Sequence, residues 1–419
     1  MLSNCYIKFK CASYQVSKIT LRHTPKGVND MKQFKRLMIL SFAINAFLIS
    51  APTHTYASST DDIESKKTAT RLNYIDTETI PYNKSFNDTK VGGLSGISYD
   101  AKSKKWLMIS DDRSEENPAR FYEAQIHYNK HKFNKVKFTR MHYLTQANGT
   151  KYPNKASYNP HSQDVVVDPE SIRIDPLNRN HILYTSEGDR NLGFNPFIRI
   201  ASRTGTLIND LQINNPIKKD DQNKYGFRNN QALEGSTFSE NGKYIWTSME
   251  APLLQDDQLP TTESGALTRL TKYNRQGDVI TEKAYSLDPI PKKPGKNKDA
   301  ENGIAEILTL NQKQLLVLER ATVQDKNSNF KNYIRVYKVD IASGTDIKNI
   351  KSLQKSHVAP VKKQLIANLN EQDIGHIDNI EGMSFGPKLP NGNDSLVFIS
   401  DNNFNQKQQT NLTAFEIKP

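Results

Sequence analysis

Apolar and small side chains alternate over short stretches of the chain, and the stretch from 233 to 250 shows the pattern most fully. Residues 235–238 alternate in this way, an Asn-Gly pair at 241–242 favours the left-handed conformation of a tight turn, and residues 244–247 are β-branched and aromatic. This stretch predicts an antiparallel hairpin. The start of its first strand lies beside the end of its second, so Glu234 and Glu250 are expected to lie together at the open edge.

The same plan recurs four more times, with an acidic or polar residue at the same two places. The first strands carry it at Ser95, Glu170, Glu306 and Glu381, and the returning strands carry an acid at Asp111, Glu187, Glu319 and Asp401. With Glu234 included, the first-strand positions are about 64 to 75 residues apart. Strand-rich repeats of this length, separated by Gly, Asn and Pro, predict the blades of a β-propeller.

Each repeat contains two further strands after its hairpin. They are expected at 120–128 and 135–144, 197–201 and 206–213, 267–273 and 279–287, and 333–339 and about 364–369. The strands at 71–80 and 411–418 have no hairpin partner, so they are predicted to complete the blade that contains 380–401, which removes exposed strand edges. The fold class is therefore all-β, a propeller of five four-stranded blades. A sixth blade would need a degenerate unit within 145–168 or 346–378.

The N-terminal residues predict export. Residues 31–36 are basic, residues 37–49 are largely apolar, and Ala57 is the small residue before a cleavage site, as in a signal peptide. Residues 1–30 lack this character, so translation is expected to start at Met31. A flexible polar lead-in at 58–70 and a propeller domain at 71–419 would follow. A periplasmic or secreted bacterial protein with no stable membrane insertion is expected, and an uncleaved anchor helix is the alternative.

The net charge and the positions of the cysteines limit which binding partners and covalent cross-links are expected. The formal net charge is +12, but residues 1–57 hold eight Lys or Arg and one Asp, so the processed chain would carry about +5. A mild excess spread over the surface indicates no nucleic-acid partner. Both cysteines, Cys5 and Cys11, lie in the part expected to be removed, so no disulfide is expected. We expect a monomer that acts on small molecules.

The acids suggest a metal site, because the innermost strands of a propeller line its central channel. Two unit charges about 4 Å apart repel by about 4 kcal/mol at an effective dielectric of 20, so converging carboxylates need protons or cations. Oxygen ligands without Cys favour Ca²⁺ or Mg²⁺ over zinc or copper, and Ca²⁺ is preferred because its coordination geometry is the more flexible. The expected ligands are Glu170, Glu234, Glu306, Glu381, Asp111 and Asp401. The alternative is that these acids only hold neighbouring blades in register.

Arginine follows several of the outer acids, at Arg113, Arg190 and Arg320. Guanidinium groups pair bidentately with phosphate and other oxyanions, so these residues are candidates for substrate binding. Candidate catalytic carboxylates are Glu187, Glu234 and Glu250. Ion pairs with neighbouring acids are the alternative for each arginine. Ser95 is disfavoured as a nucleophile because its segment lacks the second glycine of a nucleophile elbow.

Several spaced motifs resemble the phytase-like domain family of exported bacterial proteins, described as "esterase-like activity of phytase". They are DPESI at 168–172, ALEG at 232–235, NGIAE at 302–306, DNIEGM at 378–383 and ISDD at 109–112, within a resemblance that covers about 88–404. The resemblance implies a β-propeller and hydrolysis of phosphate esters or other esters. It also lends weight to Glu170, Glu234, Glu306 and Glu381 as metal ligands, by analogy with β-propeller phytases and lactonase-type propellers, but it transfers no established catalytic set.

Three functions remain open at this stage. The first is calcium-assisted hydrolysis of a small anionic ester, favoured by the acids and the recurring arginines. The second is a propeller that binds a ligand or partner without converting it, favoured by the absence of a distinct nucleophile. The third is lactonase-type hydrolysis, which keeps the metal without a phosphate. The first repeat departs from the others because it carries Ser95 in place of a glutamate, which leaves the ring of acids asymmetric.

Overall fold

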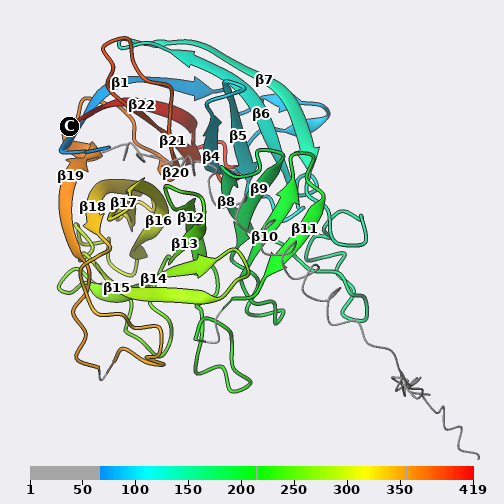
Figure 1. Cartoon of the computed structure of the whole chain (residues 1–419), viewed down its shortest axis with the longest axis vertical. Helices are drawn as coiled ribbons and strands as arrows, with labels where there is room; N and C mark the ends of the chain where they lie inside the picture. The colour runs from blue at the N-terminus through cyan, green and yellow to red at the C-terminus, as the bar shows by residue number, and fades with distance from the viewer. Residues whose placement is uncertain (1–66, 214–215, 355) are drawn as a thin grey trace, which may run out of the picture. The chain divides into compact units, whose positions relative to one another are not determined.

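The computed structural model describes residues 67–213, 216–354 and 356–419, and five four-stranded antiparallel sheets within them form the blades of a β-propeller (Figure 1). Blade 1 contains β4 (Leu94–Asp100), β5 (Lys105–Ser110), β6 (Arg120–Tyr128) and β7 (Phe133–Tyr143). Blade 2 contains β8 (Pro169–Ile174), β9 (His181–Ser186), β10 (Phe197–Ser202) and β11 (Leu207–Leu211). Blade 3 contains β12 (Leu233–Phe238), β13 (Tyr244–Met249), β14 (Ala266–Asn274) and β15 (Val279–Leu287). Blade 4 contains β16 (Ala300–Asn311), β17 (Gln314–Gln324), β18 (Phe330–Asp340) and β19 (Lys362–Asn368).

Blade 5 joins the two ends of the described chain. It contains β20 (Asn379–Phe385), β21 (Ser395–Asp401) and β22 (Thr410–Lys418), and its fourth strand is β1 (Arg71–Ile80), which pairs with β22. The predicted all-β propeller of five blades and its closure are confirmed. The remaining elements are the short strands β2 (Ser85–Phe86) and β3 (Thr89–Lys90) and the 3₁₀ turn η1 (Leu369–Glu371).

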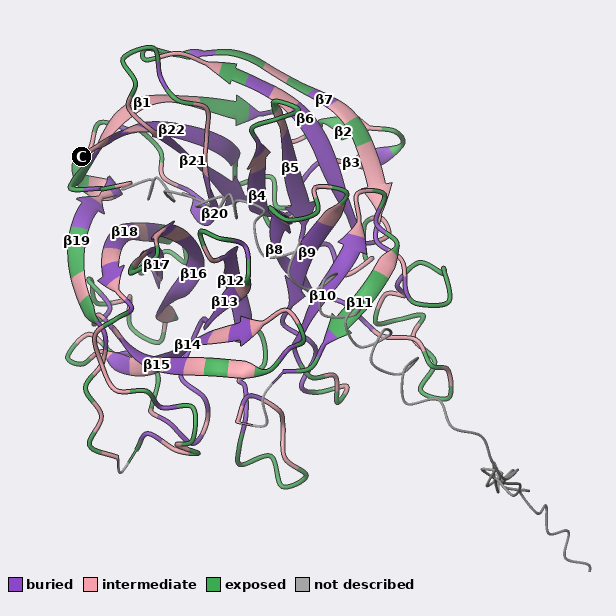
Figure 2. Cartoon of the chain, in the orientation of Figure 1, coloured by how far each residue is buried: buried purple, intermediate pink, exposed green. Residues whose placement is uncertain are grey.

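Apolar clusters join neighbouring blades. Phe398 and Phe415 of blade 5 pack with Leu316 of blade 4, and Trp106 of blade 1 packs with Val397 of blade 5. Similar clusters lie between blades 1 and 2, 2 and 3, and 3 and 4. Figure 2 shows the inner strands as buried, whereas the outermost strands β11 and β15 also carry exposed and partly exposed positions.

Residues 346–354 and 356–361, part of the region considered for a sixth blade, instead line the outer edge of blade 3. Ile347 N donates to Glu282 O at 2.8 Å and Val361 N donates to Ala284 O at 2.9 Å, so β15 does not present a bare strand edge there. The predicted signal peptide at 31–57 and most of the lead-in at 58–70 lie outside the described residues. Within the described part, no helix has the length and apolar character needed to cross a membrane.

Candidate functional site

Each innermost hairpin has a β-bulge at its open end, and the bulge fixes which side chains reach the mouth of the channel. The residues at the bulge are Ser95, Glu170, Glu234, Ala305 and Glu381. At the same end of each hairpin, one residue of the second strand, or just after it, faces the first strand. Its backbone pairs with the residue that lies two positions before the bulge. These residues are Asp111, Glu187, Glu250, Arg320 and Asp401, and we call them the mouth ring. The predicted open-edge geometry of Glu234 and Glu250 therefore repeats in every blade.

Blade 4 corrects two sequence assignments by one residue. The sequence predicts Glu306 as the first-strand acid of this repeat, but the bulge that holds this position in the other blades falls at Ala305 in blade 4. The expected outer acid was Glu319, but Arg320 pairs with Gly303 and takes the mouth-ring position. Because neighbouring side chains on a strand point in opposite directions, an offset of one residue sends both glutamates away from the mouth.

Glu306 lies inside the channel and is paired with Arg173 of β8. The Arg173 Nη2–Glu306 Oε2 distance is 2.6 Å, and both side chains are buried. Arg173 also donates to the backbone oxygens of Ser236 at 2.7 Å and Ile97 at 2.6 Å, so one guanidinium contacts blades 1, 3 and 4. Burial raises the pKa of Glu306 to about 7, against the opposing effect of Arg173. We call this pair the channel plug.

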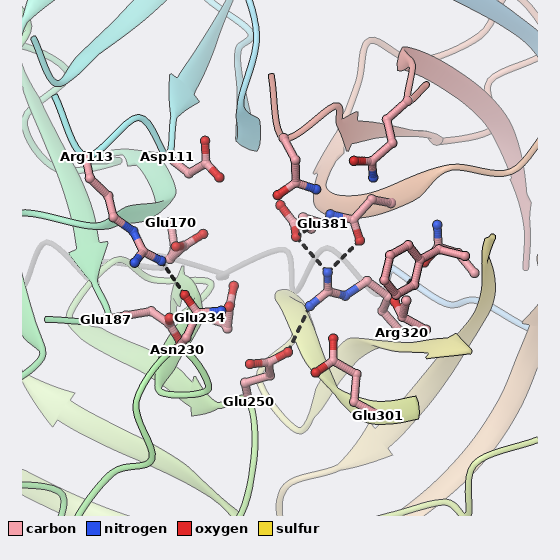
Figure 3. A pocket seen from close by; sticks show the side chains of 16 residues that line it. Asp111, Arg113, Glu170, Glu187, Asn230, Glu234, Glu250, Glu301, Arg320 and Glu381 are labelled. Atoms are coloured by element: carbon pink, nitrogen blue, oxygen red, sulfur yellow. Dashed lines mark hydrogen bonds and ion pairs between the residues drawn. The ribbon is translucent and has the colours of Figure 1, made fainter. Parts of the chain in front are cut away.

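A cavity of about 340 Å³ opens at the mouth (Figure 3). Seven carboxyl groups line it: Asp111, Glu170, Glu187, Glu234, Glu250, Glu301 and Glu381. Two guanidinium groups line it as well, Arg113 and Arg320, together with neutral residues that include Asn230, Asn379 and the exposed Phe330. The carboxyl groups outnumber the arginines by more than three to one.

The two arginines lie on opposite sides of this cavity (Figure 3). Arg113 Nη2 is 2.6 Å from Asp168 Oδ2 and also donates to Asn230 Oδ1. Arg320 Nη2 is 2.8 Å from Glu250 Oε1, and its Nη1 is 2.8 Å from Glu381 Oε1. Each guanidinium therefore ties together residues from different blades.

A model of the phytase-like family, described as esterase-like activity of phytase, matches residues 89–404. The chain belongs to this family. The resemblance inferred from the spaced motifs is thereby confirmed for most of the propeller. A search of curated proteins found no match to this phytase-like chain.

Solved structures resemble the phytase-like chain at low identity. The PQQ-bound aldose sugar dehydrogenase from Streptomyces coelicolor is 9% identical, with 83% of this chain and 99% of that chain covered and a TM-score of 0.35. The catalytic domain of a GH62 α-L-arabinofuranosidase from Coprinopsis cinerea is 8% identical, with 84% and 98% covered and a TM-score of 0.41. MPT-4, a mannose phosphorylase from Leishmania mexicana in complex with a phosphate ion, is 9% identical, with 92% and 93% covered and a TM-score of 0.31. At these scores the similarities say nothing about the activity of this chain.

Burial and mutual repulsion hold several carboxyl groups of the phytase-like mouth in the protonated form when no cation is bound. Burial, followed by the charges of nearby acids, raises the pKa of Glu170, Glu187 and Glu234 well above the usual range. Burial raises the pKa of Glu250 to about 8 and that of Asp168 to about 6, in each case against a neighbouring arginine. These carboxyl groups can all be ionised at neutral pH only if positive charge enters the site.

The donor set fits a hard cation. Two groups of three acids place one oxygen of each acid within 4.8 Å of the others: Asp168, Glu170 and Glu187, and Glu187, Glu234 and Glu250. Glu234 is 7% exposed, and its carboxylate makes no hydrogen bond or ion pair with any residue that the structure describes. All donors are carboxylate oxygens, which suit Ca²⁺ or Mg²⁺.

The structure places the predicted site residues unevenly. Of the expected ligands, Glu170 and Glu234 belong to these groups, Asp111 and Glu381 line the cavity, and Asp401 is buried in the mouth ring without lining it. Glu306 does not reach the cavity. Of the expected substrate-binding arginines, Arg113 and Arg320 line the cavity and Arg190 does not. Arg190 instead donates to the backbone oxygens of Phe227 and Tyr225, in the segment that leads into β12.

Ser95 and Asp168 also lie at the mouth, and their contacts show what each can do there. Ser95 Oγ donates to Glu170 O at 2.9 Å and is buried, which agrees with its rejection as a nucleophile. Asp168, which completes the first group of three acids, is not among the site residues that the sequence predicts. It stands two residues before Glu170 in the motif at 168–172, and its backbone oxygen accepts from Glu187 N at 3.1 Å. The motif at 168–172, which begins with Asp168, is therefore the sequence feature that could have identified this residue as part of the site.

The raised pKa values predict how stability depends on pH without metal. The native state holds protons on Asp168 and Glu250 up to pKa values of about 6 and about 8, whereas the unfolded chain releases them near pH 4. The free energy of unfolding in a chelator should therefore fall as pH rises, by about 1.4 kcal/mol per pH unit for each proton, with Asp168 contributing up to about pH 6 and Glu250 up to about pH 8. Thermal unfolding at each pH, with and without added calcium, measures this slope, and a stability that rises with pH in the chelator would contradict it.

Proposed function

We propose that this chain is an exported hydrolase of small anionic esters, phosphate esters foremost, and that its mouth holds Ca²⁺. The observation that carries the proposal is the cavity itself, where seven carboxyl groups and two arginines meet, and where Glu234 has no partner among the described residues. A purely architectural role would leave the acids paired with hydrogen-bond donors. Export rests on the signal-like pattern at 31–57 and is checked by N-terminal sequencing of the processed protein, expected to begin near Ser58.

In this proposal, some residues of the mouth bind the calcium ion and the anionic substrate, and another transfers a proton. Asp168, Glu170 and Glu187 would hold the calcium ion. When bound, calcium polarises a phosphoryl or carbonyl oxygen and offsets the charge that develops there. Arg113, whose side chain is 37% exposed, is the arginine placed to meet an anionic oxygen of the substrate.

Glu234 is the proposed general base. In the proposed step its carboxylate accepts a proton from water, the water oxygen forms a bond to phosphorus, and the bond from phosphorus to the alcohol oxygen breaks. The electron pair leaves on the alcohol oxygen, which takes a proton from solvent unless it departs as a stable anion such as p-nitrophenolate. A carboxylate without other partners can take up this proton without first breaking an existing hydrogen bond. The same arrangement could act on a carboxylic ester or a lactone, where the water attacks a carbonyl carbon.

A substrate screen tests the proposal. The purified processed protein is assayed on p-nitrophenyl phosphate, p-nitrophenyl acetate and gluconolactone, in calcium and in EGTA. We expect turnover of the phosphate ester in calcium and a loss of about 100-fold or more in EGTA, because several kcal/mol of charge stabilisation disappear with the cation.

Re-adding calcium should restore both turnover and thermal stability. A preference for the lactone would move the assignment to lactonase-type hydrolysis. A protein that is inert on all three substrates in calcium, yet is stabilised by calcium, would contradict hydrolysis and favour a propeller that binds its ligand without converting it.

A further inference from the structure

We propose that Arg320 is a resident cation that takes the place of a second metal ion, so that the mouth accepts an external cation only on the side of Asp168, Glu170 and Glu187. The inference rests on the proposed function, because it concerns how the same mouth is neutralised. The first observation is the strand register of the innermost hairpins. In four blades the mouth-ring position carries an acid, and in blade 4 the same backbone position carries Arg320, paired with Gly303.

The contacts of Arg320 are those expected of a bound cation. Its Nη2 is 2.8 Å from Glu250 Oε1 of blade 3, and its Nη1 is 2.8 Å from Glu381 Oε1 and donates to Asn379 Oδ1 of blade 5 at 2.5 Å. The residue is only 9% exposed. One guanidinium thus joins the acids of the two blades that flank its own (Figure 3).

On the opposite side of the mouth, no guanidinium joins two acids in this way. Arg113 lies there, but its ion pair is with Asp168. Among the contacts described, no arginine is within ion-pair distance of Glu170, Glu187 or Glu234, although the charge of Arg113 acts on Glu187 and that of Arg320 acts on Glu234. Glu187 accepts a hydrogen bond from Ala232 N, and the Glu234 carboxylate makes no hydrogen bond or ion pair in the described part of the chain. Buried carboxylates without an ion pair therefore remain beside Asp168, and an external cation would bind there.

A guanidinium can play this part for two reasons. It stays charged throughout the pH range in which proteins fold, and its planar fork can engage two carboxylates at once. Without Arg320, Glu250 and Glu381 would be left in the same position as Glu170 and Glu187. The mouth would then contain two regions of uncompensated carboxylates, each able to take a divalent ion.

Calcium stoichiometry tests this inference directly. The full processed protein is compared with Arg320→Gln by equilibrium dialysis against radioactive calcium, with terbium luminescence as a second readout. Arg320→Gln is expected to bind one more calcium ion per chain than the unsubstituted protein, and its thermal stability should depend more steeply on calcium. Arg320→Lys keeps the charge and is expected to keep the original stoichiometry.

A triple variant serves as the control. Arg320→Gln combined with Glu250→Gln and Glu381→Gln removes the cation together with its acids, so it should fold and bind calcium as the unsubstituted protein does, even if Arg320→Gln alone fails to fold. An unchanged stoichiometry in folded Arg320→Gln would overturn the inference, as would an extra ion in the triple variant. If the unsubstituted protein binds no calcium but Arg320→Gln binds one ion, the proposed function fails and the role of Arg320 stands.

Discussion

Replacing Glu234 with glutamine is expected to lower kcat for phosphate-ester hydrolysis by about 100-fold or more, because a positioned general base contributes roughly that factor. Little folding should be lost, since the carboxylate has no hydrogen bond or ion pair within the described residues. Burial and the charges of Glu250 and Glu187 raise the pKa of Glu234, so a neutral amide should even stabilise the metal-free protein above the ordinary pKa of a glutamate. Measuring kcat and KM at saturating calcium, together with thermal unfolding in EGTA, checks both parts.

Glu240→Gln is the matched control for this variant. Glu240 is exposed and lies at the turn of the same hairpin, at the end opposite the mouth. The substitution again replaces a carboxylate with an amide. Its kcat is expected to stay within a few-fold of the unsubstituted value. A Glu234→Gln protein that turns over substrate at the normal rate would remove Glu234 from the proposed mechanism, and one that unfolds would show that the carboxylate has a structural partner.

The fold could be predicted from the sequence because each blade repeats the same local pattern. The strands expected at 120–128 and 279–287 coincide with β6 and β15, and the pairing of 71–80 with 411–418 follows from the need to close a ring. Alternation of side chains, turn residues and repeat spacing are properties of neighbouring residues, so they can be read without knowing the three-dimensional contacts.

The residues of the mouth could be predicted only in blades where the acid occupies the same position relative to the β-bulge. In blade 4 the acid follows the bulge instead of occupying it, and no local pattern distinguishes Ala305 from Glu306 as the bulged residue. The arginines show the same limit. Arg113 stands two residues after its mouth-ring acid, Arg190 three residues after, and Arg320 is itself in the ring, so their recurrence in the sequence does not place them in equivalent positions.

The channel plug explains where the displaced acid of blade 4 goes, and it leads to the largest expected effect on stability. Replacing Arg173 with methionine should lower the free energy of unfolding by about 3–5 kcal/mol, because it leaves a buried carboxylate without its cation. It also removes the donors to Ser236 O and Ile97 O, which join neighbouring blades. Denaturant unfolding in calcium and in EGTA measures the loss, which should not depend on calcium, because the plug lies outside the cavity.

The pH dependence of this loss identifies its cause. Burial already raises the pKa of Glu306 to about 7 with Arg173 present, and without the arginine the pKa should rise further. A raised native pKa means that the folded protein keeps a proton that the unfolded chain releases above about pH 4.5, so the Arg173→Met protein should lose more stability at pH 8 than at pH 5. The double variant Arg173→Met, Glu306→Leu removes the carboxylate as well and should recover part of the loss at pH 8, because no charge then remains to be buried. A single variant that loses less than about 1 kcal/mol, or a double variant that recovers nothing at pH 8, would show that the plug does not hold the blades together through this charge pair.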